Sequence, residues 1–280
     1  MNYRHAFHAG NFADVMKHAI LARVLVHLAR KDTAFRAIDT HAGLGFYDLE
    51  ADEAARTGEW RDGIGRLDAP LAPEAEALLA PYREALARVR ARHGPTIYPG
   101  SPALIREFLR PQDRGVLNEL HPADGAVLRE RYNADPRTKV LGLDGWTALH
   151  ALIPPRERRG LVLVDPPYEA RDEHARLARE LAKAVAKWPT GLFLGWYPIK
   201  DLGPVEAMVR TLAGSVTRPV LRLELLVDRP DGPGLAGSGL LVVNAPWTLE
   251  GEARPLLAAL AGRLARSGRG GSRCEALAAA

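Results

Sequence analysis

The sequence contains a single cysteine, Cys274, among its 280 residues. One cysteine permits neither a disulfide within the chain nor a cysteine-rich metal cluster, which excludes a disulfide-stabilised secreted domain. No apolar run approaches the roughly 18 residues that a membrane-spanning helix needs. The N-terminal segment carries His, Arg, Asn and Asp where a signal peptide has its apolar core. We therefore expect a cytoplasmic protein with no membrane partner.

The chain also has little net charge. Its 38 Lys and Arg residues and 34 Asp and Glu residues give a net charge of +4. This balance permits binding to a polyanion without requiring it. The excess is concentrated near the C-terminus and in one loop, at Arg254, Arg263, Arg266, Arg269 and Arg273, and at Arg156, Arg158 and Arg159. Nucleic acid is therefore a candidate partner.

With 47% hydrophobic residues, the chain has the composition of a folded protein, and its length favours one large α/β domain. Apolar residues at helical spacing predict a helix over 13–30. Residues 34–39 predict a strand that leads into a glycine-containing turn, THAGLG. Four later apolar runs end at polar or acidic residues and are separated by segments long enough for helices: GVLNE, VLGLD, GLVLVD and GLFLGWY. The pattern predicts a parallel sheet that binds its ligands at the carboxyl ends of the strands.

Two regions depart from this alternation. Residues 46–98 are rich in alanine, leucine and charged residues, and they predict an inserted subdomain of helices without strands. Residues 219–227 and 237–247 predict a hairpin that closes the sheet edge with an antiparallel strand. We therefore divide the chain into a main domain of 1–45 and 99–265, a helical insertion of 46–98, and a flexible tail of 266–280.

Asp165, Pro166, Pro167 and Tyr168 directly follow the predicted strand GLVLV. A strand exit stiffened by two prolines is a purely structural explanation of this motif. The functional explanation starts from the exocyclic amine of a nucleobase, a poor nucleophile whose lone pair is delocalised into the ring. The Asp165 carboxylate and the backbone carbonyl of Pro166 can accept its two N–H bonds and stabilise the charge that grows during attack. Tyr168 can stack on the base.

The tetrapeptide after a strand resembles the signature of amino-group methyltransferases that use S-adenosylmethionine and act on adenine or cytosine. This resemblance implies a donor site on the preceding strands. Gly43 lies in a segment similar to the first loop of that fold, Glu119 is expected to bind the donor's ribose hydroxyls, and Asp144 its adenine amine. An ordinary turn at Gly43, a solvated Glu119 and a turn-forming Asp144 are the alternatives.

Further motifs extend the resemblance over nearly the whole chain. They occur in the order YRHAFHAGNFADVMKH, IDTHAGLG, AARTGEW, YPGSP, ELHP, DGW, LVDPPYE and WYP. In these motifs the sequence resembles the RlmJ family of bacterial large-subunit (23S) ribosomal RNA adenine-N6 methyltransferases. The resemblance implies a Rossmann-like class I methyltransferase sheet, mostly parallel with an antiparallel last strand, and a helical insertion after the first strand. It also implies methylation of N6 of one adenosine in that RNA.

The same resemblance implies residue roles. Asp165 would be the catalytic residue, and Tyr3 would contact the RNA. A larger group would surround S-adenosylmethionine, namely His18, His41, Ser101, Glu119, Asp144 and Gly145. Arg4 and Lys17 are expected to contact phosphates on the basis of charge alone. The insertion and the arginine-rich tail depart from the family pattern, which leaves RNA contacts there open.

Several of these residues have alternative interpretations. His5, His8 and His18 lie close together in sequence, but neither a cysteine nor a further acidic cluster stands at metal-site spacing, so no metal is expected. His18 is alternatively a surface histidine, and Ser101 an N-cap of the helix that follows. For Trp196 we favour a place in a pocket wall or in the core, and the alternative is that it stacks on the target base.

Two rival functions remain open at the level of sequence. The tetrapeptide does not distinguish ribose from deoxyribose, so a DNA adenine-N6 methyltransferase has the same site chemistry. A catalytically inactive RNA-binding assembly factor of the same fold is the other rival. The lack of a recognisable DNA-recognition motif and the intact Asp-Pro-Pro-Tyr sequence favour an rRNA methyltransferase, which we expect to be a monomer.

Overall fold

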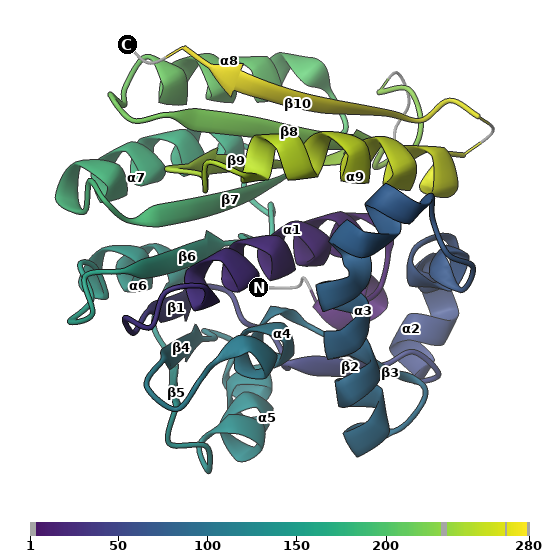
Figure 1. Ribbon diagram of the computed structural model, residues 1–280, viewed down its shortest axis with the longest axis horizontal. Helices are drawn as coiled ribbons and strands as arrows, with labels where there is room; N and C mark the ends of the chain where they lie inside the picture. The colour runs from purple at the N-terminus through teal and green to yellow at the C-terminus, as the bar shows by residue number, and fades with distance from the viewer. Residues whose placement is uncertain (1–3, 231–233, 267, 279–280) are drawn as a thin grey trace.

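A central sheet lies between two layers of helices in the computed structural model, which describes residues 4–230, 234–266 and 268–278 (Figure 1). The sheet has eight strands in the order β10-β8-β9-β7-β6-β1-β4-β5. Their bounds are β1 (Arg36–Asp39), β4 (Arg114–Asn118), β5 (Thr138–Leu141), β6 (Gly160–Val164), β7 (Leu192–Ile199), β8 (Val220–Leu226), β9 (Gly237–Val243) and β10 (Gly271–Leu277).

Strands β5, β4, β1, β6 and β7 pair in parallel, as the alternation of strands and helices predicts. Strand β9 lies antiparallel between β7 and β8, and β10 is antiparallel to β8. The predicted α/β fold with a mostly parallel sheet is confirmed. All the parallel strands end at the same edge, so the residues that follow them are brought together there.

The helices divide between the two faces of the sheet. Their bounds are α1 (Phe12–Ala29), α2 (Asp52–Thr57), α3 (Pro73–His93), α4 (Ser101–Phe108), α5 (Pro122–Tyr132), α6 (Gly145–Ala151), α7 (Glu173–Lys187), α8 (Leu202–Ala213) and α9 (Leu249–Leu264), with 3₁₀ turns η1 (His5–Phe7), η2 (Glu59–Asp62) and η3 (Ile64–Leu67). Helices α1 and α9 cover one face, and α6, α7 and α8 cover the other (Figure 1).

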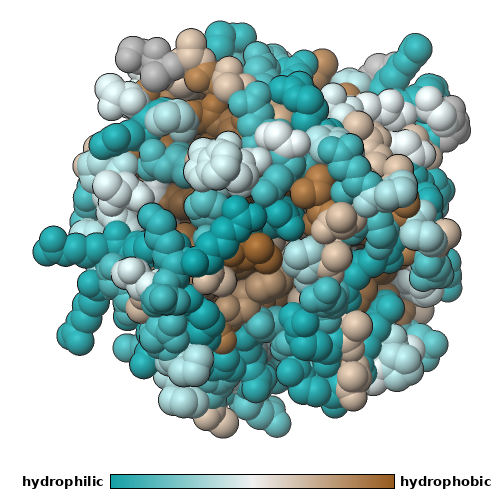
Figure 2. Space-filling model, viewed as in Figure 1, coloured by the Kyte–Doolittle hydropathy of each residue, from teal (hydrophilic) through white to brown (hydrophobic). Residues whose placement is uncertain are grey.

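Alternation along the strands explains why both faces are covered. In β6, Leu161 and Leu163 join the apolar core beneath α1 and α9, while Val162 and Val164 join the core beneath α6 and α7. A strand with apolar residues on both sides must be buried on both sides. Figure 2 shows the outer side of the α1 and α9 layer covered mainly by hydrophilic side chains, with only small apolar areas between them.

The insertion contains helices, as expected, but the prediction that it has no strand is wrong. Strands β2 (Phe46–Asp48) and β3 (Ile97–Pro99) pair antiparallel at its two ends. Three residues are too few for an alternating pattern to be recognised. Between them, α3 packs on α1 and α9, so the insertion lies against the main domain.

The tail also differs from its prediction. Residues 271–277 form β10, which pairs with β8 over its whole length and occupies the sheet edge that the hairpin was expected to close. The guanidinium of Arg273 lies 3.3 Å from Glu206 and 3.5 Å from Glu224 of β8. Glycines and alanines around this strand suggest flexibility, but the unpaired edge of β8 offers it backbone hydrogen-bond partners.

Candidate active site

Four carboxylates lie at the carboxyl ends of four neighbouring parallel strands. Asp39 ends β1, Glu119 follows β4, Asp144 follows β5, and Asp165 follows β6. A cavity opens at this edge of the sheet and is called the first cavity here. Its lining includes His18, His41, Gly43, Ser101, Glu119, Asp144, Gly145 and Asp165. The structure therefore brings together all the residues that the sequence assigns to the donor site.

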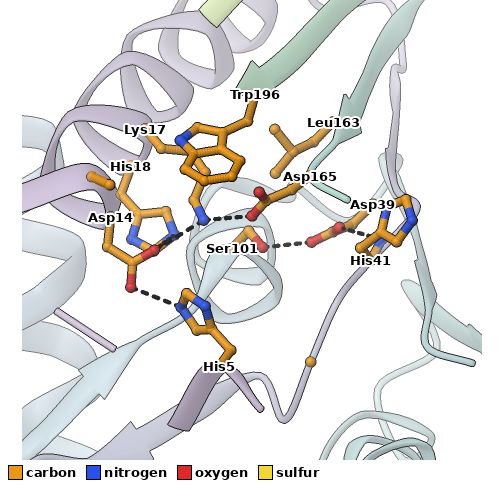
Figure 3. A network of polar contacts seen from close by, with 12 residues as sticks. His5, Asp14, Lys17, His18, Asp39, His41, Ser101, Leu163, Asp165 and Trp196 are labelled. Carbon is orange, nitrogen blue, oxygen red and sulfur yellow. Dashed lines mark hydrogen bonds and ion pairs between the residues drawn. The ribbon is translucent and has the colours of Figure 1, made fainter. Parts of the chain in front are cut away.

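Asp39 lies behind the wall of the first cavity and is fully buried. Its carboxylate accepts a hydrogen bond from Ser101 Oγ at 2.6 Å and another from the His41 backbone N–H at 3.2 Å (Figure 3). Burial raises the pKa of Asp39 to about 7, so the carboxyl group is partly protonated near neutral pH. Ser101 is the first residue of α4 and Gly100 is the N-cap, so the N-cap interpretation of Ser101 is wrong.

The glycine loop after β1 is fixed by Glu119. One carboxylate oxygen of Glu119 accepts from the Gly43 backbone N–H and the other from the His121 backbone N–H, both at 2.8 Å. Burial raises the pKa of Glu119. Gly43 has a φ of +60°, and a Cβ there would lie 2.2 Å from the hydroxyl of Tyr47. The loop can therefore hold this shape only with glycine at 43.

Asp144 and Gly145 form the start of α6 on the opposite side of the first cavity. The Asp144 carboxylate caps the helix by accepting from the Thr147 backbone N–H at 3.0 Å. A Cβ on Gly145 would lie 2.2 Å from Nε2 of His41, so the absence of a side chain makes room for that ring. Burial lowers the pKa of His41 to about 4, which leaves the ring neutral at pH 7.

Lys17, which we expected to contact an RNA phosphate, is almost fully buried and is already paired with two carboxylates. Its side chain is 5% exposed, and its ammonium lies 2.5 Å from Oδ2 of Asp165 and 2.9 Å from Oδ1 of Asp14 (Figure 3). Burial opposes the charge, but the two carboxylates raise the pKa of Lys17 above its usual value. Asp14 also accepts from His5 Nε2 at 2.9 Å. A chain of polar contacts thus runs from His5 in the N-terminal segment through Asp14 and Lys17 to Asp165.

His18 is buried as well, so its interpretation as a surface histidine is wrong. Its Nδ1 lies 2.9 Å from the hydroxyl of Tyr98, which in turn lies 3.1 Å from the hydroxyl of Tyr82. Burial lowers the pKa of His18 to about 3 and keeps the ring neutral. Its Nε2 is buried and has no hydrogen-bond partner among the described residues, while the side chain lines the first cavity.

A second cavity adjoins the first, and Asp165, Pro166 and Pro167 line both. Its lining also includes His5, Asn11, Phe12, Glu59, Tyr168, Trp196, Lys200 and Arg266. Tyr168 has a φ of +53° and donates from its hydroxyl to the Trp196 carbonyl oxygen at 3.0 Å. Burial and the nearby Asp165 raise the pKa of Tyr168 well above its usual value, so the hydroxyl stays protonated. Trp196 is thus a cavity wall, as we favoured.

The other predicted RNA contacts lie at the N-terminal segment. Tyr3 falls outside the described residues. Arg4 is exposed, and its guanidinium lies 3.5 Å from Glu53 of α2. The sequence interpretation missed Asp14 and His5, although α1 carried a usable signal: Asp14, Lys17 and His18 interrupt one helical face that is otherwise apolar. Charges on such a face must pair with one another or with a site.

Within residues 4–230, 234–266 and 268–278, no group of three or more His, Cys, Asp or Glu side chains is arranged to hold a metal ion. In the same ranges no helix is long and apolar enough to cross a membrane.

Residues 32–277 match the family model described as "Ribosomal RNA large subunit methyltransferase D, RlmJ". Two relatives described as "Ribosomal RNA large subunit methyltransferase J", from Haemophilus influenzae and Escherichia coli, are each 38% identical over 96% of this chain and 96% of their own. The chain belongs to the RlmJ family. The sequence resemblance is therefore confirmed.

Solved structures agree on the fold of this RlmJ-family chain. The crystal structure of protein LPL1258 from Legionella pneumophila covers 96% of this chain and 98% of its own, with a TM-score of 0.86 and 32% identity. A probable spermidine synthase from Corynebacterium glutamicum has a TM-score of 0.51 at 13% identity, covering 94% of this chain and 75% of its own. At that identity the second likeness concerns the fold alone.

Proposed function

We propose that this protein transfers a methyl group from S-adenosylmethionine to N6 of an adenine in large-subunit (23S) ribosomal RNA. One observation carries the proposal: Asp165, Pro166 and Pro167 form the boundary between two adjoining cavities. A transferase of this kind needs a donor on one side of its reactive residues and an acceptor on the other. Membership of the RlmJ family supports the choice of ribosomal RNA as acceptor.

The residues of the first cavity fit S-adenosylmethionine as its resident group. When bound, it supplies an electrophilic methyl group on a positively charged sulfur. Carboxylates line this cavity, which suits a cation with an amino group and hydroxyls as donors. Glu119 would hold the ribose hydroxyls, Asp144 the adenine amine, and the backbone at Gly43 and Gly145 would allow close approach. His18, His41 and Ser101 would complete the binding site.

The second cavity would receive the target adenine. The described part of the chain offers no hydrogen-bond donor to Oδ1 of Asp165, whereas Oδ2 binds Lys17. Asp165 Oδ1 and the carbonyl oxygen of Pro166 would accept the two N–H bonds of N6, hold the nitrogen toward the first cavity and stabilise its growing positive charge. The proton that N6 loses would pass to Asp165 Oδ1. Tyr168, held by Trp196, would stack on the base.

Lys17 would act on this step through Asp165. Its ammonium fixes one carboxylate oxygen in place, so the other faces the cavity boundary in one orientation. Asp14 and His5 hold Lys17 from behind. Preorganised groups of this kind avoid rearrangement during the reaction. Lys17 is therefore a positioning residue in our proposal, not an RNA contact.

The remaining expectations belong to the same proposal. The main domain of 1–45 and 99–265 would carry the chemistry, and the insertion of 46–98 would help to form the RNA-binding side. The reaction needs no metal and no covalent enzyme intermediate. We further propose a monomer that acts in the cytoplasm, where ribosomal RNA is found. The target adenine must be unpaired or leave its helix to reach Asp165.

The test is nucleoside mass spectrometry. Purified protein and labelled S-adenosylmethionine are incubated with unmodified large-subunit rRNA and, in parallel, with unmethylated duplex DNA. Labelled N6-methyladenosine from the RNA alone is the expected result. Label in DNA alone would identify a DNA methyltransferase instead, and label in neither, together with no binding of S-adenosylmethionine in calorimetry, would identify an inactive binding protein. Asp165→Ala should abolish turnover and largely spare donor binding.

A further inference from the structure

Two cations line the second cavity without a carboxylate bound to them in the described part of the chain. Lys200 directly follows β7, and Arg266 lies in the segment between α9 and β10, so two different elements bring them to this cavity. Within the described ranges, no side-chain hydrogen bond or ion pair engages the Lys200 ammonium or the Arg266 guanidinium. Most other charged side chains that line the cavity are engaged with protein groups.

Among the described residues, the carboxylates of the same wall form no hydrogen bond or ion pair with these two cations, although Glu59 and Arg266 attract each other at longer range. Glu59 is hydrogen-bonded to His8 at 3.0 Å and to Asn11 at 3.0 Å. Asp14 and Asp165 share Lys17. Glu169 also lines the cavity and has a contact of its own. A cavity of this kind has a reactive carboxylate at one end and two cations that no described carboxylate binds. It suits a ligand that combines an anionic group with a neutral group that can reach the carboxylate.

Arg266 is also held in a defined place. Its guanidinium carbon lies 5.7 Å from the ring centroid of the buried Phe12, at the start of α1. Its backbone N–H donates to the Val227 carbonyl oxygen at 2.6 Å. A guanidinium packed on an aromatic ring keeps its N–H donors available in one plane, which matches the geometry of a phosphate.

We propose that Lys200 and Arg266 form a phosphate clamp that holds the RNA backbone next to the target nucleotide. This assignment rests on the proposed function and adds residues that position the acceptor. Phosphate contacts fix the position of a nucleic acid without reading its sequence. With the backbone held at the cavity rim, the neutral base of one nucleotide can enter toward Asp165. The clamp therefore contributes to binding of the RNA and leaves the donor site unchanged.

The test compares Lys200→Gln, Arg266→Gln and the double variant with the unchanged protein, using unmodified large-subunit rRNA. Glutamine keeps much of each side chain's length and removes its charge. We expect KM for the RNA to rise roughly tenfold for each lost cation, as for a hydrogen bond to a charged group. The slope of log Kd against log salt should fall by about 0.7 for each. The Kd for S-adenosylmethionine should stay constant.

Matched controls are Lys31→Gln and Arg218→Gln, exposed cations that precede β1 and β8 at the opposite edge of the sheet. Lys200→Arg keeps the charge and should retain the salt slope, which separates the clamp from a folding defect. Unchanged KM and slope in the double variant would overturn the clamp while leaving methylation by the unchanged protein intact. If the unchanged protein methylates no rRNA, the proposed function itself fails.

Discussion

The ammonium of Lys17 lies 2.5 Å from Oδ2 of Asp165 and 2.9 Å from Oδ1 of Asp14, so one cation joins two carboxylates from α1 and from the loop after β6. The lysine and the aspartate of the Asp-Pro-Pro-Tyr loop are 148 residues apart in sequence. Lys17 and Asp14 are buried and Asp165 is partly buried, so an unpaired charge in this place would be costly.

Lys17→Met removes the cation and keeps a side chain of similar length. We expect the free energy of unfolding to fall by about 3 kcal/mol, since the buried Asp14 and the partly buried Asp165 then lose the cation between them, although Asp14 keeps its hydrogen bonds from His5 and Gly10. Urea unfolding measures the change. In a double-mutant cycle with Asp165→Asn, the double variant should lose less than the sum of the single changes. Additive losses would show that the two groups do not interact energetically.

Ionisation of Asp39 should make the free energy of unfolding depend on pH. Burial raises its pKa from 3.8 to about 7 in the folded protein. The folded state therefore holds the proton more tightly than the unfolded state, and ionisation destabilises the fold progressively as pH rises from about 4 to 7. Asp39→Asn cannot ionise, so its stability relative to the unchanged protein should improve over this range by roughly 4 kcal/mol. Urea unfolding at pH 4.5, 6 and 7.5 measures this difference.

Asp113 is a control, because its ionisation should change the free energy of unfolding with pH in the opposite direction. Its buried carboxylate accepts hydrogen bonds from Arg110, which hold its pKa below the usual value despite burial. Asp113 therefore stabilises the fold above about pH 4 and loses this effect as pH falls below it. Asp113→Asn should lose stability relative to the unchanged protein as pH rises. If Asp39→Asn shows the same trend as Asp113→Asn, the assignment for Asp39 is wrong.

Strand ends were readable from sequence because each apolar run stops at a polar residue, and parallel strands all end at one edge. This placed Glu119, Asp144 and Asp165 correctly in one site. The burial of Lys17 was not predicted because a charged residue is rare on a buried helix, and the sequence does not show that Asp165 lies opposite it. Strand β10 was missed for a related reason: pairing with a distant strand gives a short polar segment a structure that its own composition does not favour.

Gly145→Ala tests how tightly the first cavity is built. A Cβ would lie 2.2 Å from Nε2 of His41, so the ring must move into the cavity or α6 must shift. We expect lower thermal stability and weaker binding of S-adenosylmethionine in calorimetry, although alanine favours helices over glycine by about 1 kcal/mol. Gly251→Ala is the matched control, since Gly251 lies in α9 with nothing within 4 Å of a Cβ. The control should be equally or more stable, and equal behaviour of both variants would contradict the steric argument.

His18→Gln tests the ring nitrogen Nε2, which lies 4.0 Å from Oδ1 of Asp14 in the wall of the first cavity. Nε2 of His18 is buried without a hydrogen bond among the described residues, which costs about 1–3 kcal/mol unless a ligand supplies the partner. We expect the Kd for S-adenosylmethionine to rise roughly tenfold when this nitrogen is displaced, as for the loss of one hydrogen bond.

His27→Gln is the control for His18→Gln. His27 lies on the same helix and also has a buried nitrogen without a hydrogen-bond partner in the described part of the chain, but it lines neither cavity. Tyr98→Phe removes the hydroxyl that holds Nδ1 of His18 and should weaken donor binding by a smaller factor. Equal affinity in His18→Gln and His27→Gln would mean that the buried nitrogen of His18 does not meet the donor.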